Sequence, residues 1–304
     1  SDVTRRGFVE RGGCIRCRIL GTEKKIIILE LVIYSMGKTL LILALLTLLI
    51  DSVGWKKFIY FISLGYGYSI AGIGIALIVM HFRALNLLDF ALIALLIVYG
   101  FRLATYLLRR ELKSKAYAKT VSLDAMTNDS YSKGVLSAIW ISCVILYICQ
   151  MFPIIVRVQN MADGVATPQI IGWIGFAVAV LGVLLESWAD HQKSAAKKVN
   201  PDRFVDTGLY RIVRCPNYLG EVTLWTGVFI SGIGCYSAWW HWLLALFGYI
   251  GIVYIMFSGA RRLEIRQDKN YGEDPEYQAY KKRVPILIPL LPIYSVKRFN
   301  WLRG

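Results

Sequence analysis

The chain alternates between long apolar runs and shorter polar segments. Seven of the runs approach or exceed the length that a helix needs to cross about 30 Å of hydrocarbon. The expected spans cover residues 26–50, 58–80, 87–108, 135–156, 170–185, 218–235 and 239–257. The pattern therefore predicts an all-α fold, a multi-pass membrane helix bundle of about seven transmembrane helices.

Composition supports a membrane protein. The chain has 304 residues, of which 56% are hydrophobic, and its mean hydropathy is +0.51. Both values exceed those of ordinary soluble domains. We expect a polar N-terminal tail at residues 1–25 and a single membrane domain at residues 26–304.

The formal net charge of +15 could suggest a nucleic-acid-binding protein. However, the basic residues lie between the apolar runs, as in membrane loops, and form no separate basic module. Attraction to anionic headgroups explains the excess more simply. Membrane lipids are therefore expected partners, and nucleic acids are not.

The same charges predict an orientation. If the seven spans alternate, 24 Lys and Arg residues gather on one side of the membrane and 9 on the other. The positive-inside rule then places the C-terminus in the cytosol. We expect the endoplasmic reticulum membrane if the source is eukaryotic and the inner membrane if it is bacterial.

Cysteine and histidine content predicts no metal site. Cys14 and Cys17 form a single C-x-x-C pair, and the three histidines do not complete a zinc-binding set with it. The other four cysteines are scattered along the chain, and nothing in their spacing requires a disulfide.

The junction DTGLYRIVRCPNYLGE at residues 206–221 is the most informative segment, because it leads directly into an apolar run. It places an amide, a hydroxyl, a carboxylate and two guanidinium groups at the mouth of a membrane helix. These are Asn217, Tyr218, Glu221, Arg211 and Arg214. Ionisable groups at the edge of lipid are costly and usually mark a functional site.

Two further polar stripes recur at helical spacing. One follows the span at 170–185 and comprises Glu186, Asp190, Lys193 and Lys197. The other follows the span at 239–257 and comprises Arg261, Glu264 and Asp268. Either stripe could hold solvated ion pairs, or it could offer acceptors for hydroxyls and cations for phosphates, as a dinucleotide requires.

Three predictions concern residues inside the spans. Arg102 lies in the middle of an apolar run and should face the bundle interior or a wet cavity. Tyr106 shares a face with Arg102 and could donate a hydrogen bond to a carbonyl, or could simply be a tyrosine near the interface. We expect Gly65, Gly67, Gly72 and Gly74 to allow close helix packing.

Two segments carry a resemblance to a known family: GLYRIVRCPNYLGE at 208–221 and GEDPEYQAYKKRVPILIP at 272–289. From about residue 182 to residue 289 the chain resembles the C-terminal domain of the steroid 5α-reductase family. TYLLR at 105–109 is similar to that family's segment with a substrate-facing tyrosine. The resemblance implies a membrane-embedded enzyme that takes hydride from NADPH. Its substrate would be a steroid, isoprenoid or other lipid with a C=C bond conjugated to a ketone.

The resemblance also implies residue roles. Tyr106 would be catalytic and hydrogen-bond the ketone oxygen. Asn217 suits the nicotinamide carboxamide because an amide both donates and accepts, and arginines suit phosphates. The implied cofactor-binding residues are Glu186, Asp190, Lys197, Arg203, Arg214, Asn217, Tyr218, Glu221, Arg261 and Glu264.

The chain departs from the steroid-reducing members at one point. Those members pair the tyrosine with an acidic residue in an early span, whereas the first two expected spans here contain only Glu30. A lipid substrate other than a steroid therefore stays open. The cofactor site is not a Rossmann domain, because no G-x-G-x-x-G follows a strand.

Two alternative functions remain. Isoprenylcysteine and phospholipid methyltransferases share the frame G-x-Y-x-x-x-R-x-P-x-Y-x-G and bind S-adenosylmethionine, but they usually carry histidine where this chain has Cys215. The second alternative is a non-enzymatic lipid-binding or transport protein that keeps the same bundle.

Overall fold

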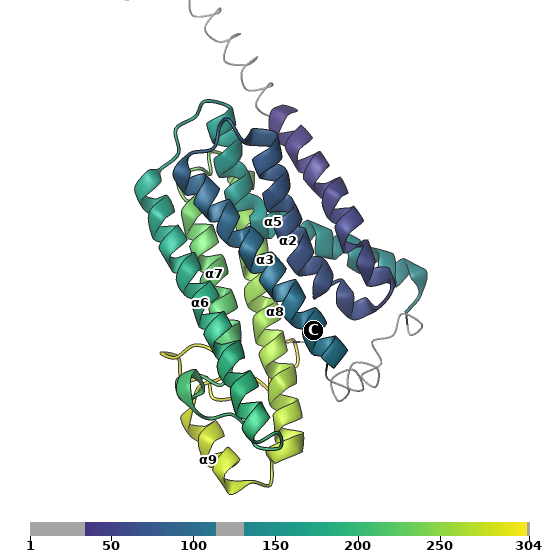
Figure 1. Ribbon diagram of the computed structural model, residues 1–304, viewed down its shortest axis with the longest axis vertical. Coiled ribbons are helices and arrows are strands. Elements are labelled where there is room, and N and C mark those ends of the chain that lie inside the picture. Colours follow the sequence, from purple (N-terminus) through teal and green to yellow (C-terminus); the bar gives the residue numbers. More distant parts are fainter. Residues whose placement is uncertain (1–33, 114–130, 303–304) are drawn as a thin grey trace, which may run out of the picture. The chain divides into compact units, whose positions relative to one another are not determined.

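The structure, a computed structural model, describes residues 34–113 and 131–302. The predicted tail at 1–25, the Cys14/Cys17 pair and Glu30 lie outside the described residues. Contacts within the chain divide it into two compact units, Ser1–Ile42 and Leu43–Gly304. Residues 34–42 of the first unit are helical, and the second unit holds the elements that follow (Figure 1).

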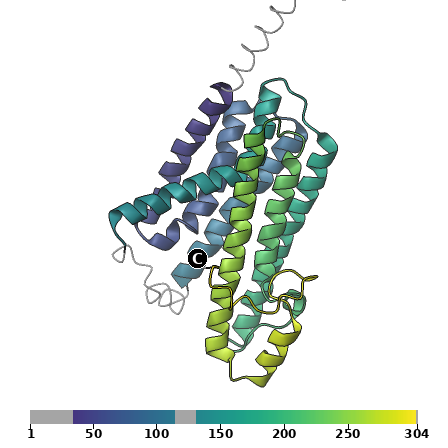
Figure 2. The ribbon, with the colours of Figure 1, turned by 180° about the vertical axis from the view of Figure 1, so that it is seen from behind.

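The described part of the second unit consists of helices joined by loops and has no strand. Its long helices are α2 (Leu64–His81), α3 (Leu87–Lys113), α5 (Lys133–Ala162), α6 (Gln169–Val199), α7 (Pro216–Gly232) and α8 (Trp239–Tyr271). Its short elements are η1 (Ser52–Trp55), η2 (Phe58–Tyr60), η4 (Gly208–Arg211) and α9 (Pro275–Arg283). Helices α6, α7 and α8 run side by side in both views (Figures 1 and 2).

Six described helices are long and apolar enough to cross a membrane, which confirms the multi-pass helical bundle. They are Tyr34–Trp55, Phe58–His81, Leu87–Arg109, Lys133–Ala162, Gln169–Val199 and Trp239–Tyr271. The expected span at 218–235 corresponds to α7, which has 17 residues and is shorter than each of these six helices. Helices α6 and α8 extend beyond their predicted spans, because the two polar stripes continue the same helices.

Arg157 directly follows the expected span at 135–156, and we expected it in a loop, as one of the 9 basic residues on the second side of the membrane. Instead, α5 continues past Arg157 and buries it completely. Its guanidinium pairs with Asp89 of α3 at 2.7 Å and donates to the Ser231 carbonyl at 2.8 Å. Arg157 therefore joins helices inside the bundle and does not count as a loop charge.

The contact between α6 and α7 is made through glycines. A Cβ atom at Gly182 would lie 2.2 Å from the backbone nitrogen of Leu224, and one at Gly220 would lie 2.5 Å from that of Glu186. A Cβ at Gly227 would also collide with the α6 backbone. The two backbones therefore touch, as small residues allow in membrane helices. This contact places the polar end of α6 directly against the start of α7.

Helices α2 and α3 pack in the same way. A Cβ at Gly67 would lie 2.7 Å from the Gly100 carbonyl oxygen, and one at Gly100 would lie 2.4 Å from that of Gly67. This confirms the predicted close packing at Gly67. The other three glycines predicted for this role abut side chains of Asp51, Ile50 and Ile97.

The glycine contact between α6 and α7 predicts the outcome of a small substitution. Gly182→Ala should lower the free energy of unfolding by about 1–3 kcal/mol, because the new methyl group meets backbone that cannot rotate away. Thermal unfolding of the purified protein in detergent measures the change. Gly134→Ala is the matched control, since a Cβ there meets only the Ser132 hydroxyl at 3.9 Å. Equal stability of the two variants would contradict the close contact.

Candidate functional site

Glu221 lies at the centre of a buried polar cluster. Its Oε1 accepts hydrogen bonds from the hydroxyls of Tyr66 at 2.6 Å and Tyr99 at 2.5 Å, and from the indole nitrogen of Trp225 at 3.1 Å. All four side chains are buried. Oε2 of Glu221 accepts no hydrogen bond from the described residues. Three helices, α2, α3 and α7, thus meet at one carboxylate, and we call these four residues the Glu221 cluster.

Arg102 of α3 ties α6 to this region. Its Nη2 lies 2.8 Å from Oε1 of Glu186, and its Nη1 lies 3.8 Å from Oδ2 of Asp190. The prediction that Arg102 faces the bundle interior is therefore confirmed. Oε2 of Glu186 is buried and has no hydrogen-bond partner among the described residues. The two carboxylates of the first polar stripe and Glu221 thus lie on facing helices with one guanidinium among them.

Tyr106 is two turns further along α3 than Tyr99, on the same face. It is half-buried and interacts electrostatically with Tyr210, whose hydroxyl donates to the Ala189 carbonyl at 3.3 Å. The structure thus sets Tyr106 beside the loop that precedes α7. The catalytic role implied for Tyr106 stays a prediction.

A basic pocket lies between α6, α8 and the loop that joins α6 to α7. Its volume is about 180 Å³. Four cations line it, namely Lys193, Lys197, Arg214 and Arg266. Its other lining residues include Phe204, Tyr210, Tyr271, Gln267 and Asn270. We call this cavity the basic pocket.

Arg214 is the most unusual residue of the basic pocket. It is only 1% exposed, yet its Nε and Nη1 have no hydrogen-bond partner among the described residues. Its Nη2 pairs with Glu264 at 3.3 Å and donates to the Tyr294 carbonyl. A buried charged donor without a partner is costly. The two unpartnered nitrogens of this guanidinium are therefore suited to an anion.

Glu264 is occupied by the protein itself. Its Oε1 faces Arg214, and its Oε2 accepts from the backbone N–H groups of Val296 at 2.9 Å and Lys297 at 3.1 Å. Arg261 likewise donates to the Lys297 carbonyl at 3.2 Å. Both residues, predicted as cofactor ligands, instead hold the C-terminal segment against α8 in this structure.

Lys197 and Arg203 also have protein partners. The Lys197 ammonium donates to the carbonyls of Pro201 and Arg203 and to the Tyr271 hydroxyl, so each of its three hydrogens has an acceptor. Arg203 pairs with Glu276 at 2.6 Å and Asp206 at 3.1 Å on the surface. Lys197 therefore borders the basic pocket with little donor capacity left, and Arg203 is not among the residues that line it.

Asn217 and Tyr218 open α7. The Asn217 side chain is half-buried, one turn before Glu221, and makes no hydrogen bond among the described residues. Tyr218 packs on α8, where a Cβ at Gly259 would lie 3.2 Å from its ring. The carboxamide of Asn217 therefore has donors and an acceptor that the described residues leave unused, and its role toward a cofactor stays a prediction.

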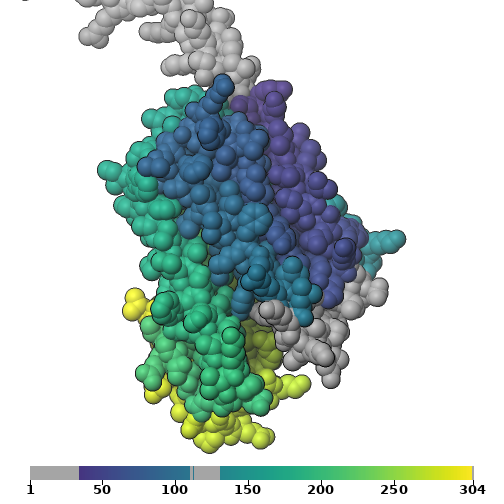
Figure 3. All heavy atoms as spheres, viewed as in Figure 1, coloured from purple at the N-terminus to yellow at the C-terminus, as the bar shows by residue number. Residues whose placement is uncertain are grey.

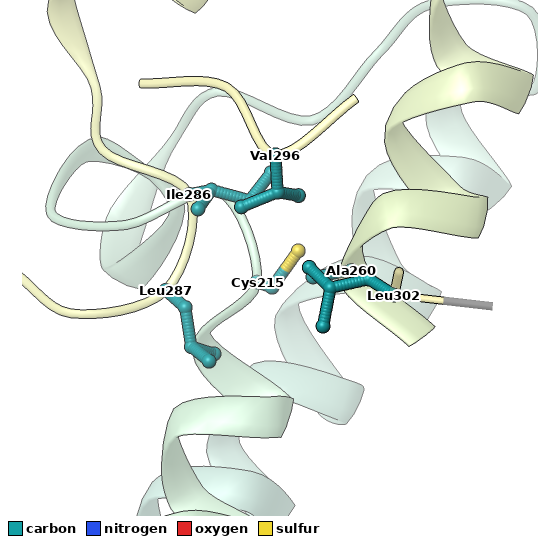
Figure 4. Packing of buried hydrophobic residues seen from close by; sticks show 6 residues of the cluster. All are labelled: Cys215, Ala260, Ile286, Leu287, Val296 and Leu302. Atoms are coloured by element: carbon teal, nitrogen blue, oxygen red, sulfur yellow. The ribbon is translucent and has the colours of Figure 1, made fainter. Parts of the chain in front are cut away.

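Cys215 immediately precedes α7 and lies in an apolar cluster with Ala260, Ile286, Leu287, Val296 and Leu302 (Figure 4). Burial raises the pKa of its thiol to about 12. The thiol is therefore a packing group and not a nucleophile at neutral pH.

One family model, described as a protein of unknown function (DUF1295), matches residues 54–284. The chain belongs to the DUF1295 family. No curated protein and no solved structure matches the chain. The family match spans the Glu221 cluster and the basic pocket, and it ends before the segment that Glu264 holds.

Sequence reasoning missed part of this DUF1295 site. Tyr99 and Trp225 were not singled out, and Arg266 was noted only as a neighbour of other arginines. A helical signal existed for one of them, because Trp225 follows Glu221 at i+4. No signal linked Tyr99 to α7, since the two are joined only by the packing of separate helices.

The contacts of Glu264 predict the behaviour of Glu264→Gln. This variant should unfold at a lower temperature even without any ligand, because it leaves the buried Arg214 without its anionic partner, a loss of about 3–5 kcal/mol in such pairs. Carboxypeptidase should also digest the C-terminal segment faster. The control is Glu273→Gln, at an exposed position. Normal stability with lost cofactor binding would instead support the cofactor role first predicted for Glu264.

Proposed function

We propose that this DUF1295 protein is a membrane-embedded reductase that uses NADPH to reduce a C=C bond conjugated to a ketone in a lipid. The substrate class covers steroids, isoprenoids and other lipid-soluble enones. One observation carries the proposal: the buried Arg214 borders the basic pocket and has two nitrogens without a partner among the described residues, and Asn217 and Glu221 follow it in the first turns of α7.

The basic pocket fits the phosphates of a dinucleotide. Phosphate oxygens accept hydrogen bonds from guanidinium nitrogens, and Nε and Nη1 of Arg214 both lack partners among the described residues. Lys193 and Arg266 add positive charge, and Phe204 and Tyr271 add aromatic surface suited to a base. The residues present therefore suit the phosphate-bearing half of NADPH.

The first turns of α7 suit the other half. The Asn217 carboxamide can donate to and accept from an amide ligand. Glu221 follows one turn later, with Oε2 free of hydrogen bonds from the described residues. Helical rise places Glu221 about 6 Å further into the bundle than Asn217. A nicotinamide held by Asn217 would therefore face the Glu221 cluster.

NADPH, when bound, would supply the hydride for the β-carbon of the enone. The protein must then stabilise the negative charge that develops on the ketone oxygen and deliver a proton to the α-carbon. Tyr66 and Tyr99 present two hydroxyls beside an acid. The acidic partner that the early spans lack in sequence is thus available in space from α7. Tyr106 remains the candidate that the resemblance implies.

The methyltransferase alternative has one supporting observation. Glu186, Asp190 and Glu221 outnumber Arg102 in this part of the bundle, and excess negative charge suits the sulfonium of S-adenosylmethionine. Against it, the position of the usual histidine is taken by Cys215, whose thiol is buried among apolar side chains. A non-enzymatic lipid-binding protein would need neither Arg214 nor the Glu221 cluster. Under each function we propose a cytosolic C-terminus, in the endoplasmic reticulum or a bacterial inner membrane.

Cofactor-induced stabilisation tests the proposal. NADPH at 100 times its dissociation constant should stabilise the detergent-solubilised protein by about 2.7 kcal/mol. NADH and S-adenosylmethionine are measured beside it by thermal unfolding. A rise in unfolding temperature with S-adenosylmethionine alone would favour the methyltransferase function. An unchanged unfolding temperature with all three compounds would favour the lipid-binding protein.

The role of the basic pocket is tested by Arg266→Gln. Arg266 is exposed and has no ion pair among the described residues, so its loss should leave the fold intact. NADPH affinity should fall about ten-fold, which corresponds to 1.4 kcal/mol. Arg262→Gln removes a neighbouring exposed charge outside the basic pocket and should change affinity little. An equal effect of both variants would indicate only a general charge effect.

Glu221→Gln tests the inner end of the site. The variant keeps an acceptor for the hydroxyls of Tyr66 and Tyr99, so it should insert and fold normally. It should nevertheless abolish the rise in unfolding temperature that NADPH causes, because the anionic group beside the proposed nicotinamide position is lost. If the variant binds NADPH with unchanged affinity in isothermal titration, Glu221 is not part of the cofactor site.

A further inference from the structure

A closed loop follows α9. The Ile286 N–H donates to the Ile293 carbonyl at 2.9 Å, and the four residues at its tip, 289–292, are all exposed. Leu290 is 92% exposed and Leu291 is 45% exposed. Pro289 and Pro292 flank the two leucines, so the tip is stiff and cannot easily fold back to bury them. We call residues 286–293 the PLLP loop.

The base of the PLLP loop is fixed at the end of a membrane helix. The backbone N–H groups of Arg214 and Cys215 donate to the carbonyls of Pro285 and Ile286 at 2.9 and 3.0 Å. Helix α7 starts at the next residue and is about 26 Å long, close to the hydrocarbon thickness of a bilayer. An α7 that crosses the bilayer has its first turn at the membrane boundary, and the base of the loop is hydrogen-bonded to the residues just before that turn.

The surroundings of the loop match a membrane interface. Ile212, Tyr294 and Trp301 are exposed apolar or aromatic side chains on the adjoining segments. Lys297 and Arg298 are exposed cations of the same segment. Aromatic and basic residues gather where protein meets headgroups. Figure 3 shows yellow atoms of the C-terminal part projecting sideways beyond the green surface of α6.

We propose that the PLLP loop is a membrane anchor. Leu290 and Leu291 insert among the acyl chains of the leaflet at the N-terminal end of α7, and the nearby cations contact anionic headgroups. The lipid surface accounts both for the exposed leucines and for the charge beside them. This proposal is independent of the reductase activity.

The anchor has a consequence for the basic pocket. The segment that follows the loop supplies the Tyr294 carbonyl to Arg214 and the Val296 and Lys297 N–H groups to Glu264. Attachment of the loop to lipid therefore helps to hold the side chain of Arg214, which borders the basic pocket.

Depth measurement by electron paramagnetic resonance tests the anchor. Leu290→Cys is spin-labelled in full-length protein that also carries Cys14→Ser and Cys17→Ser and is reconstituted in phosphatidylcholine–phosphatidylglycerol nanodiscs. The four described cysteines are buried and should not label. We expect the label to relax more with oxygen, which partitions into lipid, than with a water-soluble nickel chelate. A label at Glu273→Cys, in the exposed turn after α8, should show the opposite preference.

Two outcomes would overturn the proposal. A label at Leu290→Cys that behaves like the Glu273→Cys control shows a loop in water, and one shielded from both reagents shows a loop covered by protein. A second variant tests the cause: Leu290→Asp should shift a label at Leu291→Cys toward the nickel chelate, because a charge at the tip disfavours insertion. Unchanged depth in that variant would exclude Leu290 as an anchor.

Discussion

The backbone contact between α6 and α7 is the constraint on which the site depends. Glycines at facing positions let the two helices touch, and no side chain separates them at Gly182 or Gly220. Glu186 is thereby set beside the residue that precedes Glu221. Without this contact, the polar stripe of α6 and the polar start of α7 would face different surroundings, and no single set of residues could contact one elongated ligand.

Burial of charge in the bundle is compensated to different degrees in different places. The Arg157 guanidinium pairs with Asp89 and also donates to backbone carbonyls, although Oδ2 of Asp89 has no hydrogen-bond partner among the described residues. Glu221 has three donors on one oxygen and none on the other among the described residues. Arg214 is compensated on one side only. The Arg157 guanidinium is therefore more fully compensated than that of Arg214, which is why we place Arg214, and not Arg157, in the proposed site.

Much of the architecture could be predicted from sequence. The apolar runs located the membrane helices, and the costliness of a charge in lipid predicted that Arg102 faces inward. The polar stripes were also recognised, but the sequence did not show which of their residues contact other parts of the protein. Glu264, Arg261 and Lys197 share the charge and spacing expected of cofactor ligands, yet each satisfies carbonyls, amides or ion partners of the protein. Spacing shows which face a residue occupies, and it does not show what meets that face.

By itself, the sequence determined that this is a helical membrane protein, and it marked residues 208–221 as the candidate functional segment, because hydropathy and helical period are local properties. Tertiary structure alone decided that Tyr66 and Tyr99 meet Glu221, that Arg157 pairs with Asp89, and that two nitrogens of Arg214 are buried without a partner among the described residues. The physical reason is that these contacts join helices distant in the chain, and their geometry follows from how closely small residues allow the helix backbones to approach.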